Sequence, residues 1–350
     1  MSELCVKIAA FIQPDRAMSF KTTILPSNHS FQIGKDETIL DAALDQGLTM
    51  PYSCRNGACG VCKGKVLQGS VDYGKAQAFA LSDAEKAAGL ALFCCAKPLS
   101  DLTIESHEVT TTQEIMVKTL PCRVEKMVRL TEDIMALYLR LPSNERLQFL
   151  SGQYIDILQK EGKPRSFSLA NAPHADDLLE LHVRNIAGGT FTHHVFNEMK
   201  ERDILRIKGP LGSFCLHEDS PKPIVFVASG TGFAPVKAII EHALHIGFKR
   251  EMHFYWGVRK QADFYMLEKV KEWEAQGIKF TPVVSDEPWN GRAGFVHQAV
   301  LDDFKDLSGY AVYACGAPVV VEAAHREFTT QRGLPNDAFY SDVFTFVPKT

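Results

Sequence analysis

The feature that most constrains this chain is a set of cysteines near its start. Cys54, Cys59 and Cys62 follow one another with the spacing C-x4-C-x2-C, and the pair Cys94 and Cys95 lies further along. Small residues fill the loop, and glycine reaches backbone angles that let N–H groups approach bound sulfide. Three thiolates from one tight loop and a fourth from a remote segment meet the needs of a [2Fe–2S] cluster, which carries one electron at a time.

Other uses of these cysteines are less consistent with the sequence. A structural zinc site repeats C-x2-C pairs, and this chain has one such pair. Disulfides are typical of small secreted domains, but the chain has nine cysteines and shows no secretory signal. Unrelated buried cysteines would leave the glycines of the loop unexplained. The cluster is therefore favoured, and with it a reducing, cytoplasmic location.

Length and composition limit the remaining classes. At 350 residues the chain is long enough for two or three domains. A hydrophobic content of 45% and a charged content of 23% are typical of globular proteins. The net charge of −4 gives no basic surface for nucleic acid. The sequence has no run of about 18 apolar residues that would predict a transmembrane helix.

The pattern of predicted elements changes along the chain, which suggests a multidomain α+β protein. Residues 1–17 are expected to form an arm, and residues 18–110 a domain with strands, a helix and the cysteine loop. A linker is expected at 109–118. Residues 119–218 contain short strands at the spacing of a small β-barrel, and residues 219–350 alternate strands with helices, which predicts a parallel sheet. The predicted helices cover residues 37–46, 235–246, 264–276 and 296–304.

A glycine turn marks the start of the third region. Gly230, Thr231 and Gly232 follow the predicted strand 224–228 and precede a predicted helix. This arrangement lets a pyrophosphate approach the backbone at a helix N-terminus. Pro235 replaces the third glycine of the usual dinucleotide fingerprint and suits a first helical turn. A Gly-x-Gly alone is a weak signal, and the flanking strand and helix strengthen it.

Two known families resemble parts of the chain. The first region resembles the β-grasp fold of plant-type ferredoxins, in which the last cysteine lies four residues before a proline. Cys94 lies four residues before Pro98, so the resemblance favours Cys94 over Cys95 as the fourth ligand. The segment 230–235 resembles the ferredoxin–NADP reductase superfamily, which implies an FAD-binding β-barrel and an NAD(P)H-binding domain.

The same resemblance identifies flavin-binding candidates. Arg165, Ser166, Phe167 and Ser168 are similar to the Arg-x-Tyr-Ser/Thr motif of that superfamily, with phenylalanine in place of tyrosine. It implies that Arg165 pairs with the FAD pyrophosphate, that Phe167 lies on the flavin and that Ser168 hydrogen-bonds near flavin N5. Backbone N–H groups of the glycine-rich segment would contact phosphates. The further candidates are His182, Val183, Gly188, Gly189 and Thr190.

The nicotinamide end is identified in the same way. Cys315 and Gly316 resemble the Cys-Gly-x-Pro segment of the superfamily, which places Cys315 beside the nicotinamide. Phe344 would be the C-terminal aromatic residue that covers the flavin, with a hydrophobic tail strand as an equal alternative. The catalytic candidates are thus Ser168, Cys315 and Phe344. Segment 255–259 resembles NADH-accepting bacterial reductases, so NADH is expected; NADPH is the alternative, because Arg259 could face a 2′-phosphate, while Asp263 could contact ribose.

Residues 20–345 as a whole resemble bacterial ferredoxin-fused reductases, which include reductase components of phenol, toluene and methane monooxygenases and the CDP-6-deoxy-glucoseen reductase group. The resemblance implies electron transfer from NAD(P)H through FAD and [2Fe–2S] to a separate oxygenase, hydroxylase or dehydrase. A flavin reductase acting directly on a small molecule, and a pure electron-carrier or docking module, are the alternatives. Arg55, Lys63 and Lys65 could guide an acidic partner, although such charges are more often a solvated rim.

Overall fold

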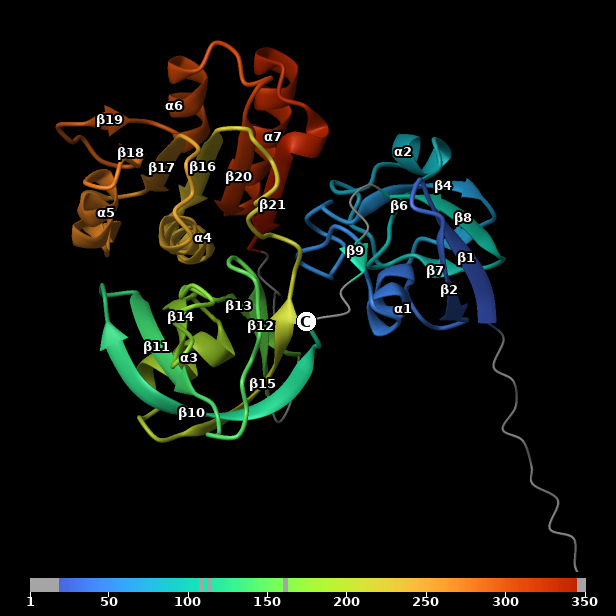
Figure 1. The fold of residues 1–350 in the computed structure, drawn as a ribbon, viewed down its shortest axis with the longest axis horizontal. Helices are drawn as coiled ribbons and strands as arrows, with labels where there is room; N and C mark the ends of the chain where they lie inside the picture. Colours follow the sequence, from blue (N-terminus) through green and yellow to red (C-terminus); the bar gives the residue numbers. More distant parts are fainter. Residues whose placement is uncertain (1–18, 107–109, 112–114, 160–162, 345–350) are drawn as a thin grey trace, which may run out of the picture.

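The chain folds around three main sheets, each with its own buried core. The computed structural model describes residues 19–106, 110–111, 115–159 and 163–344, so the arm expected at 1–17 lies outside the described residues. Figure 1 shows the N-terminal module beside a second body, in which the barrel-like sheet lies below the parallel sheet. Among the helices of the described residues, none is long and apolar enough to span a membrane.

The N-terminal module is a mixed five-stranded sheet with the order β2-β1-β8-β4-β6. Ile24, Phe31 and Ile33 alternate inward on β1 and β2 and form its core with α1. The β-grasp expectation is confirmed. The elements are β1 (Ser19–Leu25), β2 (His29–Gly34), α1 (Ile39–Asp45), β3 (Leu48–Thr49), β4 (Lys63–Gln68), β5 (Val71–Asp72), α2 (Asp83–Ala87), β6 (Leu90–Leu92), β7 (Lys97–Pro98), β8 (Leu102–Glu105) and β9 (Thr110–Thr111).

The middle body is an antiparallel six-stranded sheet with the order β13-β12-β15-β10-β11-β14. Leu120, Cys122 and Val124 alternate inward along β10. A bridge between Leu169 and Leu181 links the two ends of the sheet, as the predicted barrel requires. The elements are β10 (Lys118–Arg129), β11 (Ile134–Arg140), β12 (Tyr154–Leu158), β13 (Arg165–Ser168), β14 (Leu179–Arg184), α3 (Thr190–Asn197) and β15 (Ile204–Leu211).

The third body is a parallel six-stranded sheet with the order β19-β18-β17-β16-β20-β21. Phe226 packs on the side of α4 and α5, and Val225 and Val227 on the side of α6 and α7. The elements are β16 (Ile224–Ser229), η1 (Gly230–Gly232), α4 (Phe233–His245), β17 (Met252–Val258), η2 (Gln261–Asp263), α5 (Leu267–Glu274), β18 (Lys279–Val284), β19 (Arg292–Ala293), α6 (Val296–Asp303), β20 (Ala311–Gly316), α7 (Pro318–Arg332), η3 (Asn336–Ala338) and β21 (Phe339–Val343).

The sequence expectation differs from the structure most clearly at helix α7 and at the predicted linker. Helix α7 was not predicted, because its run of valines at 319–321 favours a strand. Pro318 in the first helical turn and Gly333, left-handed with φ 67°, mark the ends of this helix. The predicted linker at 109–118 is partly strand, since β9 pairs with β3 and β10 begins at Lys118.

A buried polar network joins the barrel to the parallel-sheet body. The Nζ of Lys237 on α4 donates to Glu180 Oε2 on β14 at 3.0 Å and to the carbonyl of Ala170 at 3.0 Å. His182 lies between Glu180 Oε1 at 2.9 Å and the hydroxyl of Tyr265 at 3.0 Å. Burial alone would raise the pKa of Glu180, but His182 and Lys237 outweigh burial and lower it to about 2.

The N-terminal module docks on the barrel through the segment just before its first loop cysteine. The backbone N–H of Tyr52 donates to Ser213 Oγ at 2.9 Å, and the hydroxyl of Tyr52 accepts from the N–H of Gly212 at 2.7 Å. Tyr154 on β12 donates its hydroxyl to the carbonyl of Ser53 at 3.0 Å. This joint fixes the loop that follows Ser53 against the barrel.

The buried network predicts a pH-dependent stability. We expect Glu180→Gln to lower the free energy of unfolding by about 3 kcal/mol near pH 7, because it removes the more buried of the two carboxylates that pair with Lys237. Since the folded-state pKa lies below the ordinary value of 4.5, the stabilisation is present above that pH and is lost as the pH falls toward about 2. Urea unfolding at several pH values measures both effects.

Glu241→Gln is the matched control, because Glu241 also contacts Lys237 but is more exposed. Its effect should stay below about 1 kcal/mol. A stability difference between the Glu180 variant and the wild type that does not shrink with acidification would contradict the assignment.

Candidate functional site

The loop that carries Cys54, Cys59 and Cys62 is tightly curved, and one of its backbone N–H groups points at a cysteine sulfur. Arg55, Gly57 and Gly60 have positive φ values of 53°, 79° and 75°. These angles curl the chain between Cys54 and Cys62. The N–H of Cys59 donates to Cys54 Sγ at 3.3 Å, so backbone donors already point at a sulfur. N–H groups directed at sulfur are one of the factors that set the potential of an iron–sulfur cluster.

The second cysteine segment is held beside the loop by strand pairing. Lys63 on β4 pairs with Leu92 on β6, and the N–H of Phe93 donates to the carbonyl of Cys62 at 3.0 Å. The first N–H groups of α1, at Ile39 and Leu40, donate to the carbonyls of Ala96 and Phe93. The ends of β4, β6 and α1 thus bring Cys62 and Cys94 together.

The four predicted ligands form two thiol pairs. Cys54 hydrogen-bonds with Cys59, which lowers the pKa of Cys54 to about 6. Cys62 hydrogen-bonds with Cys94, which together with Cys95 lowers the pKa of Cys94 to about 4. Cys95 Sγ lies between Cys94 Sγ, at 3.7 Å, and Gly57, on which an added Cβ would lie 2.7 Å from this sulfur.

This grouping fits a binuclear cluster better than a single ion. Within the described residues, no three His, Cys, Asp or Glu side chains are arranged to hold one metal ion. Two pairs of thiols suit two irons, since four cysteines bind the two irons of a [2Fe–2S] cluster. The thiolate is the form that binds metal, and one member of each pair has a lowered pKa.

The predicted flavin segments meet on the barrel. The rings of Phe167 on β13 and Phe191 on α3 lie 5.5 Å apart. Gly189 caps α3 without a side-chain hydrogen bond, and Gly188 has a φ of 77° with open space around it. The N-terminus of α3 therefore has free N–H groups and room for a phosphate. Arg165 lies at the start of β13, where its guanidinium contacts the carbonyls of residues 163 and 164.

The three catalytic candidates converge on one buried carboxyl group. Asp342 on β21 accepts a hydrogen bond from Ser168 Oγ at 3.1 Å and pairs in register with Cys315 on β20. Phe344 follows β21, and its N–H donates to the carbonyl of Gly316 at 2.9 Å. Burial raises the pKa of Asp342 and of Cys315.

The nucleotide segments are also adjacent. A Cβ at Gly232 would lie 2.2 Å from the carbonyl oxygen of Cys315, and a Cβ at Gly316 would lie 2.4 Å from Ser229 Oγ. The glycine turn and the Cys-Gly segment therefore approach more closely than side chains would allow. The turn Gly230–Gly232 is a single 3₁₀ turn that leads into α4, with Pro235 in the first turn of that helix.

Several other candidates lie apart from this site. The ring of His182 is committed to Glu180 and Tyr265, and Val183 lies in the barrel core, so a flavin contact by either would involve its backbone. Arg259 is exposed, and the carboxylate of Asp263 accepts from the N–H of Lys260.

The basic residues near the cysteine loop are mostly neutralised within the chain. Arg55 pairs with Asp41 at 2.7 Å, and Lys63 pairs with Glu85 at 2.6 Å. Lys65 is exposed. The rim therefore carries little unpaired positive charge near the predicted cluster.

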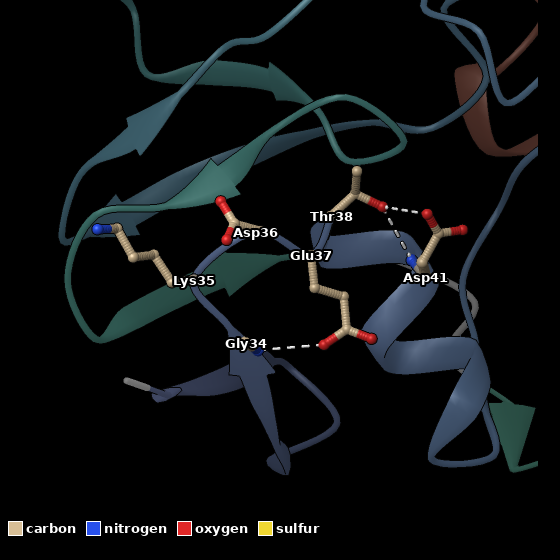
Figure 2. Close-up of a pocket in the computed structure, with 6 residues that line it drawn as sticks. All are labelled: Gly34, Lys35, Asp36, Glu37, Thr38 and Asp41. Carbon is tan, nitrogen blue, oxygen red and sulfur yellow. Dashed lines mark hydrogen bonds between the residues drawn. The ribbon is translucent and has the colours of Figure 1, made fainter. Parts of the chain in front are cut away.

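A surface hollow of about 550 Å³ lies elsewhere on the N-terminal module, beside the start of α1. Figure 2 shows that two of its side chains, those of Glu37 and Thr38, hydrogen-bond to the local backbone. Glu37 accepts from the N–H of Gly34, and Thr38 caps the N–H of Asp41. The hollow coincides with none of the predicted cofactor segments.

Sequence reasoning did not identify Asp342, or Ser53 beside the first loop cysteine. The sequence holds one signal for Asp342: it is an acidic residue within an apolar tail segment, next to Val343 and Phe344. A charged side chain in a buried strand usually has a specific partner. The partners, Ser53 and Ser168, are far away in the sequence, so only the fold connects them.

Models of three protein families match successive parts of the chain. A 2Fe-2S iron-sulfur cluster binding domain matches residues 22–99, an oxidoreductase FAD-binding domain matches 121–215, and an oxidoreductase NAD-binding domain matches 226–326. The matches fall on the module with the cysteine loop, the barrel and the parallel sheet, in that order.

Full-length relatives show the same organisation. The CDP-6-deoxy-L-threo-D-glycero-4-hexulose-3-dehydrase reductase of Yersinia pestis is 42% identical, over 93% of this chain and 99% of its own. The phenol 2-monooxygenase reductase component DmpP of Pseudomonas sp. (strain CF600) is 34% identical, over 94% and 95%. The crystal structure of the Amycolatopsis cytochrome P450 reductase GcoB superposes with a TM-score of 0.77 at 35% identity, over 93% of this chain and 99% of that chain.

The thiol pairs predict different outcomes for the two adjacent cysteines. We expect Cys94→Ser to lose most bound iron and sulfide, because it removes the partner of Cys62. Cys95→Ser should retain them, because Cys95 belongs to neither thiol pair and the smaller serine fits its place between Cys94 and Gly57. Iron and sulfide content and the visible absorption of purified protein measure this. Loss of the cluster in the Cys95 variant and its retention in the Cys94 variant would reverse the ligand assignment.

Proposed function

Since the chain belongs to the family of reductases that join a 2Fe-2S iron-sulfur domain to FAD-binding and NAD-binding oxidoreductase domains, we propose that it delivers electrons from NADH to a separate dehydrase-type protein. It is an NAD(P)H-dependent flavin iron–sulfur oxidoreductase, and its cofactors are a [2Fe–2S] cluster, FAD and NAD(H). Electrons pass through FAD and the cluster to an acceptor protein. The class of that acceptor, the choice of NADH and the roles of individual residues are the proposal.

The acceptor class rests on one observation. Identity to the dehydrase reductase of Yersinia pestis is 42%, against 34% to the phenol 2-monooxygenase reductase component, over nearly the same share of this chain. A dehydrase acting on a CDP-linked deoxy sugar is therefore the acceptor we propose. We also propose a cytoplasmic location, since the cysteines of the described residues are all free thiols.

When bound, NADH supplies a hydride, FAD accepts it and releases electrons singly, and the cluster carries one electron at a time. The residues of this chain bind and orient these groups. Backbone N–H groups at the start of α4, after Gly230–Gly232, bind the pyrophosphate of NADH. The free N–H groups of α3, with Arg165 and Ser166 on β13, bind the FAD phosphates, and Cys54, Cys59, Cys62 and Cys94 hold the cluster.

The buried residues around Asp342 orient the reacting ends. Ser168 would present the oxygen of its hydroxyl to flavin N5, because its hydrogen is donated to Asp342 and this bond fixes the direction of the hydroxyl. Cys315 lies at the end of β20 against Gly232, where the nicotinamide enters. Phe344 is tied to Gly316 and excludes water from the flavin face.

The proposed redox route predicts that flavin reduction by NADH can be separated from electron delivery through the cluster. We expect NADH to bleach both the flavin and the cluster absorbance of the wild type under anaerobic conditions. Cys59→Ser should keep flavin bleaching by NADH but lose electron delivery to a one-electron protein acceptor, because the cluster lacks a ligand. Spectra recorded during NADH titration, first of the wild type and then of the variant, measure both steps. Undiminished delivery in the variant would show that electrons leave from the flavin.

The acceptor is tested by reconstitution. The purified reductase is combined with a CDP-6-deoxy-hexulose dehydrase or with a phenol hydroxylase oxygenase component, each with its substrate. We expect NADH consumption to be coupled to product only with the dehydrase, and NADPH to support a slower rate. Coupled turnover with the oxygenase alone would replace the proposed acceptor, and a faster rate with NADPH would replace the proposed donor.

A further inference from the structure

Asp342 connects two parts of the molecule that the redox route uses. It is 5% exposed, and each of its carboxyl oxygens accepts one hydroxyl hydrogen bond. Ser53 Oγ donates to Oδ1 at 2.7 Å, and Ser168 Oγ donates to Oδ2 at 3.1 Å. One carboxyl group therefore bridges the residue before Cys54 and the residue that we assign to flavin N5.

Ser53 is held from several sides. Its hydroxyl also accepts from the N–H of Val343 at 3.3 Å, and its carbonyl accepts from the hydroxyl of Tyr154 at 3.0 Å. It is 4% exposed. The strands β12 and β21 thus fix the backbone at the point where the cysteine loop begins.

A carboxyl group is an unfavourable choice for a purely structural contact at this place. Burying it costs free energy that an apolar side chain of similar size would avoid. Its two oxygens are aimed at two serines from different modules, and its strand lies in register with Cys315. The carboxyl group is the shared acceptor where the cluster-bearing loop, the flavin strand β13 and the nicotinamide strand β20 meet.

We propose that Asp342 is a positioning residue that holds the cluster-bearing loop at a fixed separation from the flavin strand through Ser53. The inference rests on the proposed function for the identity of the two cofactors. Electrons supplied by NADH then move one at a time from FAD to the cluster, and no bond of Asp342 forms or breaks. Because electron transfer slows steeply as the separation grows, the Ser53 arm of the bridge sets the rate of this step, whereas the Ser168 arm serves the flavin strand.

The bridge can be cut on the cluster side alone. Ser53→Ala removes the hydrogen bonds of Ser53 Oγ with Asp342 and Val343 and leaves the bond between Ser168 and Asp342 intact. In the full-length protein loaded with FAD and cluster, stopped-flow spectroscopy follows flavin bleaching and cluster bleaching after mixing with NADH. We expect the first rate to be unchanged and the second to fall about tenfold, as loss of one hydrogen bond to a carboxylate would shift a docking equilibrium.

A second readout does not depend on turnover. Hydrogen–deuterium exchange of residues 340–344 should become faster in Ser53→Ala, because the N–H of Val343 loses its acceptor. The electron paramagnetic resonance spectrum of the chemically reduced cluster should stay unchanged, which shows that the ligands are intact. A wild-type rate of cluster reduction together with faster exchange would overturn the proposal.

Ser213→Ala is the matched control. It removes the side-chain hydrogen bonds to Tyr52 in the same joint but does not touch Asp342. An equal slowing of cluster reduction in both variants would show that the joint acts only as an anchor, and would overturn the role of Asp342. If the Ser53 variant does not assemble its cluster, Asp342→Ala is compared with Ser168→Ala, which removes only the hydrogen bond on the flavin side. A ratio of cluster to flavin rates that is no lower in the Asp342 variant than in the Ser168 variant then overturns the proposal.

Such a result is distinct from failure of the proposed function. If the function is wrong, NADH leaves the cluster of the wild-type protein oxidised. If only the bridge is wrong, the wild type reduces its cluster and Ser53→Ala does so at the same rate.

Discussion

The buried ion pair between Lys237 and Glu180 is the contact on which the geometry of the reductase half depends. Lys237 lies on the helix that follows the glycine turn, and Glu180 lies on the barrel strand β14. Two desolvated charges must face one another, since either alone would be strongly destabilising. The pair therefore fixes the start of α4 relative to the barrel, and with it the distance between the nucleotide segment and the flavin segment.

The C-terminal strand β21 completes this arrangement. It extends the parallel sheet beside β20, yet its residue Asp342 contacts a serine of the barrel and a serine of the N-terminal module. The three modules thus meet at one residue of the last described strand. The remaining joint, at Tyr52 and Ser213, holds the same loop from the barrel side.

The sequence was sufficient for the parts of the protein that depend on local patterns. The cysteine spacing, the strand before Gly230 and the alternation in β10 each predict structure from neighbouring residues. Helix α7 was missed because its valines favour strands, and its ends are defined by Pro318 and Gly333.

The site was predictable only in pieces. Ser168, Cys315 and Phe344 are identified separately by resemblance. Ser168 is brought to the other two by its contact with Asp342, which is 174 residues further along the chain. His182 shows that a residue can have the right place in the sequence and still not present its side chain to the flavin. Both nitrogens of its ring hydrogen-bond within the chain, to Glu180 and to Tyr265. A sequence pattern does not show which of two faces a side chain on a strand will serve.

The position of β21 in the chain has a consequence for how the protein is made. Domains tend to fold in order as the chain leaves the ribosome. The core of the N-terminal module consists of its own residues together with Tyr154 and Leu211 of the barrel, whereas β21 is synthesised after these segments and after the described segments that it contacts. The cysteine loop can therefore acquire its iron and sulfide while the route from the flavin is still incomplete.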